Sequence, residues 1–247
     1  MSKDGSGIPE WPQFSSELMR QGPAIRKAHM TSLVRYLKEK HGLKRVNILE
    51  IGSWAGASTI TWARAIKDLG LSGSLHCVDI WEPYFDLKVN PAEIYEQMNS
   101  AAEQDAIFQA FRNNISAAGV EDMVTFTRGN SRDVLPKIDA DSYQIIFIDA
   151  SHLYADVYND VVQAKRLVAD GGILCGDDFE LPAAMVDQAV HTQALSDNVD
   201  FIKDPSTGTC YHPGVSQAVA DTLGDVSVWD GLWAVRRGGL LSKRSII

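Results

Sequence analysis

The chain reads Val46-Asn47-Ile48-Leu49-Glu50-Ile51-Gly52-Ser53-Trp54-Ala55-Gly56-Ala57-Ser58 where an apolar segment meets a glycine turn. The apolar segment, residues 46–49, is short and partly β-branched, which indicates a buried strand. From residue 59 to residue 69 the apolar side chains recur with helical spacing on one face. A glycine turn between a buried strand and a helix is typical of doubly wound α/β folds, which bind nucleotide-like ligands there.

The spacing of this turn is Glu-x-Gly-x-x-x-Gly, from Glu50 through Gly52 to Gly56. It differs from the Gly-x-Gly-x-x-Gly spacing of dinucleotide-binding turns. The difference favours S-adenosylmethionine over NAD as the ligand and disfavours an NAD-dependent dehydrogenase. Neither glycine carries a Cβ, so a ligand can approach the backbone closely. A tight turn that binds no ligand is the alternative interpretation.

Composition narrows the class of protein. The 247 residues are 45% hydrophobic and 22% charged, which is ordinary for a soluble globular chain, and the net charge of −9 argues against nucleic-acid binding. Cys77, Cys175 and Cys210 form no CxxC pair, so we expect free thiols and a cytoplasmic protein. No apolar run approaches the ~20 residues of a membrane span, so no membrane partner is expected. Residues 1–12 lack the apolar core of a signal peptide.

Strand-like and helix-like segments alternate from residue 46 onward, which predicts a Rossmann-like, doubly wound α/β sheet with helices on both faces. Residues 1–44 are predicted to form an N-terminal arm and helices, and residues 45–247 one domain with a lid loop at 204–216. The seven strand candidates are 46–51, 74–80, 123–128, 143–149, 172–177, 199–203 and 226–236, and the later helix candidates are 57–69, 93–118, 132–136, 154–169 and 182–196.

Acidic residues end four of the predicted strands: Glu50, Asp79, Asp149 and Asp177. Ligands bind beyond the carboxyl ends of the strands in an open α/β sheet, and four acids on one rim repel one another unless a cation or ligand compensates them. Asp79 follows the glycine turn by about 20–30 residues, the spacing of an acid that accepts hydrogen bonds from ribose hydroxyls. Its alternative role is to cap the loop that follows.

Asp149, Asp177 and Asp178 form a second acidic group. Their carboxylate oxygens suit a hard divalent cation, Mg²⁺ or Mn²⁺. The alternative is that these acids cap the helices that follow them. His152, three residues after Asp149, is a candidate general base beside the metal, because an unperturbed histidine titrates near neutral pH. Its alternative role is a hydrogen-bonding cap at the start of a helix.

Together these residues resemble the class I S-adenosylmethionine-dependent methyltransferases, in the metal-dependent O-methyltransferase branch typified by catechol O-methyltransferase. The resemblance covers roughly residues 45–180 and implies a seven-stranded, mostly parallel sheet whose last strand is antiparallel. That family has a Glu-x-Gly-x-x-x-Gly-x-Ser turn, a ribose-binding acid, a Gly-x-Ser-x-Asp segment, and metal acids after strands four and five. The matching residues here are Glu50, Gly52, Gly56, Ser58, Asp79, Gly129, Ser131, Asp133, Asp149, Asp177 and Asp178.

The chain departs from the catechol O-methyltransferases at one position. Those enzymes place a lysine base three residues after the first metal aspartate, where this chain has His152. The Asp-x-x-His arrangement is similar to that of the macrocin-type O-methyltransferases and the cephalosporin-biosynthesis methyltransferase-like proteins. This second resemblance favours sugars and other hydroxylated natural products as methyl acceptors.

The resemblance implies divalent-metal-assisted transfer of a methyl group from S-adenosylmethionine to a hydroxyl of a small molecule. The implied catalytic residues are Asp149 and His152, with His152 as the base, and the implied metal ligands are Asp149, Asp177 and Asp178. The implied cofactor-binding residues are Glu50, Gly52, Ser53, Trp54, Gly56, Ser58, Asp79, Ile80, Trp81, Asn130, Ser131 and Asp149.

Substrate contacts are expected from the aromatic segment 81–85 and from the lid at 204–216, although dimer contacts or plain loops explain both segments as well. The sequence leaves a homo-oligomer open. His212 and Tyr211 are the alternative candidates for the base if His152 does not serve.

Two other functions stay open. A non-catalytic adenosylmethionine or nucleoside binder would need no metal, and a metal-dependent hydrolase would turn over without adenosylmethionine.

Overall fold

Seven strands form a sheet in the order β3-β2-β1-β4-β5-β9-β8, in a computed structural model that describes residues 24–238 and 241. The pairs β1/β2, β2/β3 and β4/β5 are parallel, and β5/β9 and β8/β9 are antiparallel. This topology confirms the predicted Rossmann-like, mostly parallel seven-stranded sheet. By its internal contacts the chain divides into unit 1, Met1–Asn130, and unit 2, Ser131–Ile247. The predicted arm at residues 1–14 lies outside the described residues.

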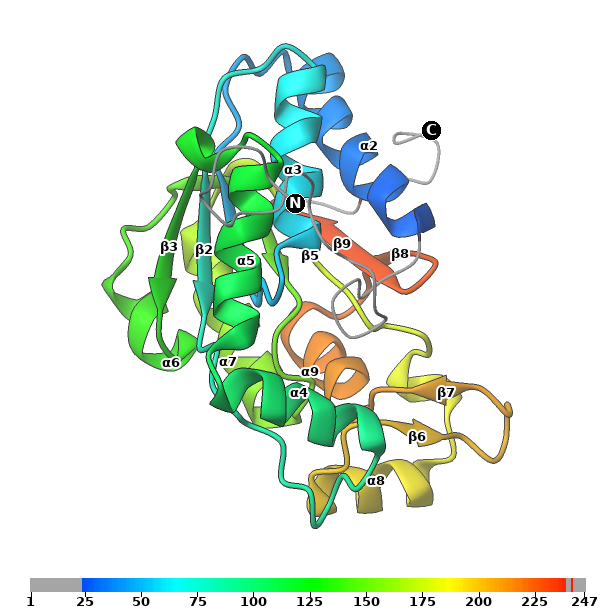
Figure 1. The fold of residues 1–247 in the computed structure, drawn as a ribbon. Helices are drawn as coiled ribbons and strands as arrows, with labels where there is room; N and C mark the ends of the chain where they lie inside the picture. The colour runs from blue at the N-terminus through cyan, green and yellow to red at the C-terminus, as the bar shows by residue number, and fades with distance from the viewer. Residues whose placement is uncertain (1–23, 239–240, 242–247) are drawn as a thin grey trace. The chain divides into compact units, whose positions relative to one another are not determined.

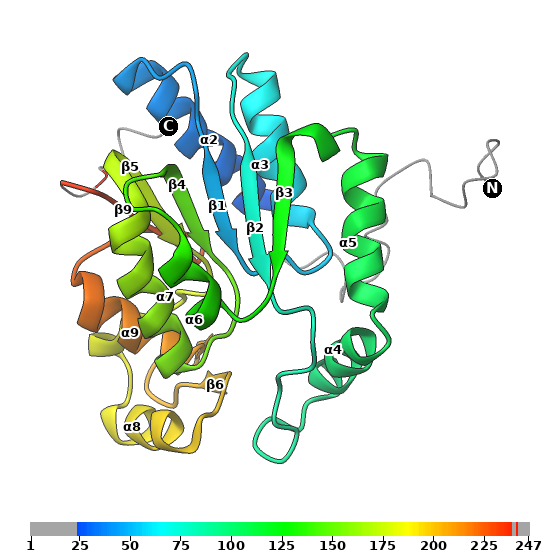
Figure 2. The same cartoon turned by 90° about the vertical axis from the view of Figure 1, so that its left-hand side faces the viewer.

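Unit 1 carries three parallel strands and their helices (Figure 1; Figure 2). All four residues of β1 are buried, as the apolar run at 46–51 predicted. Helix α2 packs against α3. The rings of Phe108 and Phe111 in α5 pack against the ring of Phe126 in β3. The elements are α2 (Ala24–His41), β1 (Ile48–Ile51), α3 (Ala57–Asp68), β2 (Leu75–Asp79), α4 (Glu93–Glu103), α5 (Ala106–Ala117), η1 (Glu121–Met123) and β3 (Val124–Arg128).

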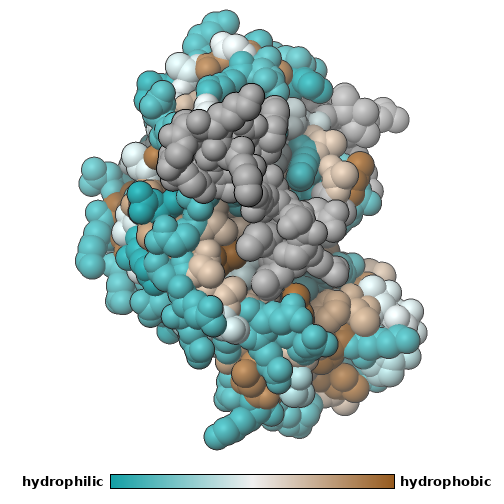
Figure 3. Space-filling view, in the orientation of Figure 1, coloured by the Kyte–Doolittle hydropathy of each residue, from teal (hydrophilic) through white to brown (hydrophobic). Residues whose placement is uncertain are grey.

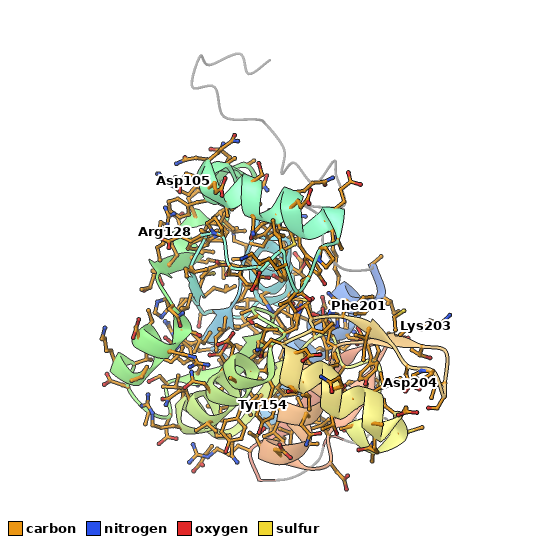
Figure 4. All side chains as sticks on the ribbon, turned by 90° about the horizontal axis from the view of Figure 1, so that it is seen from below. Asp105, Arg128, Tyr154, Phe201, Lys203 and Asp204 are labelled. Carbon is orange, nitrogen blue, oxygen red and sulfur yellow. The ribbon has the colours of Figure 1, made fainter. Side chains whose placement is uncertain are left out.

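The predicted helix at 93–118 is two helices, because the chain turns at Asp105. This residue has φ +58°, a left-handed conformation that ends a helix and that aspartate tolerates better than most residues. Its carboxylate lies beside the Arg128 guanidinium, with Arg128 Nη1 2.6 Å from Asp105 Oδ1 (Figure 4). The break separates α4, which follows the aromatic segment, from α5, which packs on β3.

Unit 2 carries the remaining strands, with α7 packed against β4 and β5. Helix α9 lies beside α7 in both ribbon views (Figure 1; Figure 2). The elements are α6 (Ser131–Val134), η2 (Leu135–Lys137), β4 (Tyr143–Ile148), α7 (Tyr154–Leu167), β5 (Val168–Gly176), η3 (Ala183–Met185), α8 (Gln188–Asp197), β6 (Ile202–Lys203), β7 (Cys210–Tyr211), α9 (Pro213–Leu223), β8 (Ser227–Trp229) and β9 (Leu232–Arg236).

Three segments of unit 2 differ from their predicted form. The strand near 199–203 does not join the main sheet but pairs as β6 with β7 in a two-stranded sheet. The strand near 226–236 is a hairpin, because Asp230 and Gly231 have φ +49° and +88°, as a two-residue hairpin turn requires. The predicted loop at 204–216 contains β7 and the first turn of α9. Its role as a lid stays a prediction.

The surface is polar over most of the face in Figure 3, and hydrophobic residues gather in the region of α8, β6 and β7. Exposed apolar side chains there include Met185, Val190 and Phe201. Among the described residues, no helix combines the length and the apolar character needed to cross a bilayer.

Gly214, in the first turn of α9, allows this helix to press on the backbone at the start of α7. A Cβ at position 214 would lie 2.2 Å from the carbonyl oxygen of His152 and 2.4 Å from the nitrogen of Tyr154. Neither backbone atom can swing aside as a side chain can. The close approach therefore fixes His212, two residues earlier, relative to His152.

We predict that Gly214→Ala destabilises the protein, although glycine to alanine normally stabilises a helix by ~1 kcal/mol. The added methyl must displace backbone, at a cost of roughly 1–3 kcal/mol. The midpoint of thermal unfolding, followed by circular dichroism, should fall by several degrees. An unchanged or higher midpoint would show that the start of α9 is not held against residues 152–154.

Candidate functional site

The turn after β1 depends on glycine at both of its ends. Gly52 and Gly56 have φ +86° and +88°, a region that residues with a Cβ rarely adopt. A Cβ on Gly56 would also lie 3.2 Å from Phe111 and 3.3 Å from Ile115 of α5. The second glycine therefore lets α3 begin close against α5.

Asp79, at the end of β2, holds this turn with its carboxylate. Oδ2 accepts the backbone N–H groups of Ser53 at 2.8 Å and Trp54 at 2.9 Å, and Oδ1 accepts that of Trp81 at 2.7 Å. Burial raises the pKa of Asp79, and the backbone hydrogen bonds oppose that rise. Asp79 is thus a loop cap, the alternative weighed above. The backbone N–H of Ile80 is a fourth group that opposes the rise, so the turn itself occupies most of the about four acceptor positions of this carboxylate.

The side chains of Trp81 and Asn114 also donate hydrogen bonds to the backbone of this turn. The indole N–H of Trp81 donates to the carbonyl of Trp54 at 2.8 Å, and Asn114 Nδ2 donates to the carbonyl of Ala55 at 2.9 Å. Trp81 as a whole is only 1% exposed. In this conformation it offers a ligand little surface, and its roles in cofactor and substrate binding stay predictions.

Glu50 is the fully buried acid of the turn. Its Oε2 accepts the hydroxyl of Ser53 at 2.8 Å and that of Thr59, whereas Oε1 has no hydrogen-bond partner among the described residues. Burial raises the pKa of Glu50, and hydrogen bonds from Thr59, Ser58 and Ser53 oppose that rise. A buried acceptor without a donor is costly, so Oε1 is a position where a ligand N–H would be stabilising.

Ile80, Asn130 and Ser131 are further predicted cofactor residues. The carbonyl of Ile80 accepts a hydrogen bond from Arg128 Nε at 3.3 Å, and Asn130 is exposed. In unit 2, the Ser131 hydroxyl bonds to the buried Asp160, whose pKa burial raises to about 6. The sequence analysis missed Arg128, Asn114 and Asp160, because their partners lie far away in the sequence.

Unit 2 brings together Asp149, His152 and Asp178, which end β4, precede α7 and follow β5. One donor atom from each lies within 4.8 Å of the others, close enough to share a cation. Asp178 reaches this position with φ +61°. Asp177, the neighbouring acid, belongs to no such group among the described residues. Its role as a metal ligand stays a prediction.

His152 lies between two carboxylates. Its Nε2 is 3.1 Å from Asp178 Oδ2, and its Nδ1 is 3.1 Å from Asp200 Oδ1. Burial favours the neutral ring, but the charges of Asp200 and Asp178 raise the pKa of His152 well above its usual value. The titration near neutral pH that holds for an unperturbed histidine therefore shifts upward in this arrangement. A cation that neutralised the charge of one carboxylate would lower the pKa of His152 again.

His212 and Glu180 extend this cluster. His212 Nε2 is 3.8 Å from Asp200 Oδ2, and its Nδ1 is 3.4 Å from Glu180 Oε2. His212 entered the sequence analysis only as a substitute base, and Asp200 and Glu180 did not enter it. No local sequence pattern identifies Asp200 and Glu180 as site residues. Each contacts its histidine only because of the way in which residues 199–214 fold.

Tyr211, the other substitute base, is fully buried, and its hydroxyl lies 3.0 Å from His191 Nδ1. Burial, with the nearby charges of Asp204 and Asp187, raises the pKa of Tyr211 to about 12. A phenol with that pKa stays protonated at neutral pH, so Tyr211 is unsuited to be the base.

Residues 49–179 match a family described as "Methyltransferase domain". The chain is 23% identical over 131 residues to the O-methyltransferase ankF of Aspergillus thermomutatus, a match that covers 53% of this chain and 44% of that relative, so the chain spans less than half of its length.

Two solved structures have a similar fold. A putative caffeoyl-CoA O-methyltransferase from Staphylococcus aureus has a TM-score of 0.53 at 17% identity, over 88% of this chain and 85% of that one. The O-methyltransferase TomG from Streptomyces achromogenes, solved in complex with SAM, has a TM-score of 0.50 at 20% identity, over 86% and 80%. At these identities the likeness concerns the fold alone.

We predict that Asp160→Asn stabilises the protein at pH 8 and that the gain shrinks as the pH falls toward 5. Folded Asp160 keeps its proton up to about pH 6, whereas an unfolded aspartate loses it near pH 4, so the wild type loses stability between these values as the pH rises. The gain above pH 6 should be about 2–3 kcal/mol. Thermal unfolding of the wild type and the variant between pH 5 and pH 8 measures this difference in stability.

The exposed Asp133 of the neighbouring helix α6 supplies the matched control. Asp133→Asn should give no gain that grows with pH. A lower melting temperature for Asp160→Asn at pH 8 would mean that the fold stabilises the ionised form of Asp160.

Proposed function

Because the chain belongs to the methyltransferase domain family, we propose that it is an S-adenosylmethionine-dependent, divalent-metal-assisted O-methyltransferase that acts on a hydroxyl group of a small molecule. One observation carries the proposal. The domain match begins in β1, one residue before Glu50, and ends one residue after Asp178. It therefore includes the turn that Asp79 holds and the residues Asp149, His152 and Asp178.

The proposed cofactor site consists of the glycine turn, Glu50 and Asp79. The Asp79 carboxylate accepts a hydrogen bond from a ribose hydroxyl, and Glu50 Oε1, which has no partner among the described residues, accepts one from the ammonium group of the methionine moiety. Gly52 lets the ligand approach the backbone. Ser131 and Asn130 are proposed for the adenine. The complex of TomG with SAM is a precedent for this ligand on a similar fold.

The proposed metal ligands are Asp149 and Asp178, with Asp177 as the third acid of the sequence prediction. Clustered carboxylate oxygens fit a divalent cation such as Mg²⁺ or Mn²⁺. Such a cation, when bound, lowers the pKa of the acceptor hydroxyl and offsets the charge of Asp178. That offset removes part of the attraction that keeps His152 protonated.

In the proposed reaction, the N–H at Nδ1 of His152 donates to Asp200, and Nε2 takes the proton of the acceptor hydroxyl. The acceptor oxygen then forms a bond to the sulfonium methyl as the carbon–sulfur bond breaks. Adenosylhomocysteine leaves as a neutral thioether, and the proton stays on His152 until solvent removes it. The contribution of Asp149 and Asp200 is orientation, which is worth several kcal/mol in such transfers.

The proposed substrate class is a sugar or another hydroxylated natural product. Tyr84 is 38% exposed and stacks on Phe85, with ring centroids 4.1 Å apart. Asn99 of α4 fixes this pair, because its Oδ1 accepts the backbone N–H of both residues at 3.2 Å. The exposed ring of Tyr84 suits the apolar face of a sugar or of an aromatic acceptor.

The cofactor proposal predicts that Asp79→Ala weakens binding of adenosylhomocysteine about tenfold or more, because one charge-assisted hydrogen bond is worth ~1.5–3 kcal/mol. The variant also releases three backbone N–H groups, so calorimetry should compare this ligand with its 2′,3′-dideoxy analogue. The wild type should bind the analogue at least tenfold more weakly than the parent ligand, and Asp79→Ala should bind the two about equally.

Glu82→Ala, which removes an exposed acid three residues away, is the control and should behave as the wild type. If Asp79→Ala still discriminates between the two ligands as the wild type does, Asp79 is a loop cap only.

The metal proposal predicts that Asp149→Asn binds Mn²⁺ at least tenfold more weakly and loses methyl transfer, because a neutral amide replaces a ligating carboxylate. Free Mn²⁺ is measured by electron paramagnetic resonance. Transfer is measured as release of adenosylhomocysteine across a panel of sugars, catechols and other hydroxylated acceptors. Addition of Mg²⁺ should displace Mn²⁺ from the wild type.

Asp133→Asn, in an exposed acid of α6, is the matched control and should retain both properties. Methyl transfer that survives exhaustive chelation with EDTA would contradict metal assistance. Acceptor turnover without adenosylmethionine would favour the metal-dependent hydrolase, and cofactor binding that no divalent ion affects, without transfer, would favour the non-catalytic binder.

A further inference from the structure

Two imidazoles and one carboxylate meet in unit 2, beside the proposed acidic metal site. Donor atoms of His152, Asp200 and His212 all lie within 4.8 Å of one another. Asp200 uses its two oxygens separately, with Oδ1 3.1 Å from His152 Nδ1 and Oδ2 3.8 Å from His212 Nε2. The two rings lie close, with centroids 4.3 Å apart. One ring nitrogen of each histidine therefore converges on the same carboxylate.

The other ring nitrogen of each histidine faces a different carboxylate. His152 Nε2 lies 3.1 Å from Asp178 Oδ2, and His212 Nδ1 lies 3.4 Å from Glu180 Oε2. Histidines that bind a metal through one nitrogen almost always donate the N–H of the other to a carboxylate or carbonyl, which fixes the ring and its tautomer. Both histidines have this outer support, and it is independent of the convergence on Asp200.

The three groups are also held in place. The side chain of Asp200 is 2% exposed and that of His212 is 12% exposed. The ring of Phe201, on the segment that leads into β6, packs on His212 with centroids 4.6 Å apart (Figure 4). Gly214 presses the start of α9 on the backbone of His152, as described above. A site built from such fixed side chains needs little rearrangement to bind a metal ion.

We propose that His152 Nδ1, His212 Nε2 and Asp200 form a second metal site, selective for a borderline transition-metal ion such as Zn²⁺ or Co²⁺. Imidazole nitrogens favour these ions over Mg²⁺, which prefers oxygen ligands and retains its waters. The site differs from the proposed Mg²⁺ site in its ligands, and its existence does not depend on methyl transfer. A metal on Nδ1 leaves Nε2 of His152 as an N–H donor to Asp178. Occupation of this site and action of His152 as a base therefore exclude each other.

The test is a Co²⁺ titration of the full chain in excess Mg²⁺, which saturates any oxygen-only site. Visible absorption reports four- or five-coordinate Co²⁺ bound through nitrogen. We expect one equivalent of Co²⁺ per chain, an intense visible band, and its loss on addition of Zn²⁺. His212→Gln should weaken binding at least tenfold, and Glu180→Gln roughly 10–100-fold through loss of outer support. Circular dichroism checks that each variant folds.

Two variants serve as controls. His41→Gln changes an exposed histidine of α2 and should leave the titration unchanged. Asp149→Asn should also leave it unchanged, because Asp149 belongs to the proposed Mg²⁺ site and not to this one. Failure of the methyltransferase proposal and failure of this site are therefore distinguishable.

Three results would overturn the second site: no visible band on addition of Co²⁺, displacement of bound Co²⁺ by Mg²⁺, or wild-type affinity in folded His212→Gln. If His212→Gln does not fold, Glu180→Gln decides the question, because this side chain is 29% exposed. Wild-type affinity in that variant would equally overturn the assignment.

Discussion

The carboxylate of Asp79 is the constraint on which the turn after β1 depends. It accepts the backbone N–H groups of Ser53, Trp54 and Trp81, and so ties the turn after β1 to the end of β2. Gly52 and Gly56 adopt left-handed conformations in this turn, and two of the donors, Trp54 and Trp81, also have positive φ. The carboxylate that caps this turn is therefore also the one proposed to bind the ribose of the cofactor.

A different constraint, the balance of charge, governs unit 2. His152 lies between Asp178 and Asp200, and these carboxylates raise its pKa against the effect of burial. A histidine so placed responds to whatever neutralises its neighbours. A cation on Asp178 would prepare His152 to accept a proton, and a cation on its Nδ1 would prevent this. The same three side chains thus allow two opposite outcomes, depending on where a metal ion binds.

The alternation of apolar segments predicted the sheet well, because burial on both faces leaves a strong pattern in parallel strands. The prediction was wrong where single residues turn the chain. Asp105 splits one predicted helix, and Asp230 with Gly231 converts one predicted strand into a hairpin. The strand near 199–203 pairs with Cys210–Tyr211, since its few residues carry no signal for their partner.

The sequence by itself determined the fold class, the glycine turn, Asp79, and the acids and histidine that follow β4 and β5, because local spacing places them at strand ends. Only the tertiary structure decided that Asp200 meets His152 across 48 residues and that His212 joins them. It also decided that Tyr211 is buried and that the charges of two carboxylates raise the pKa of His152. Contacts of this kind leave no periodic pattern, since they depend on how residues 199–214 fold back on the start of α7. A pKa depends in turn on charges that only those contacts bring close.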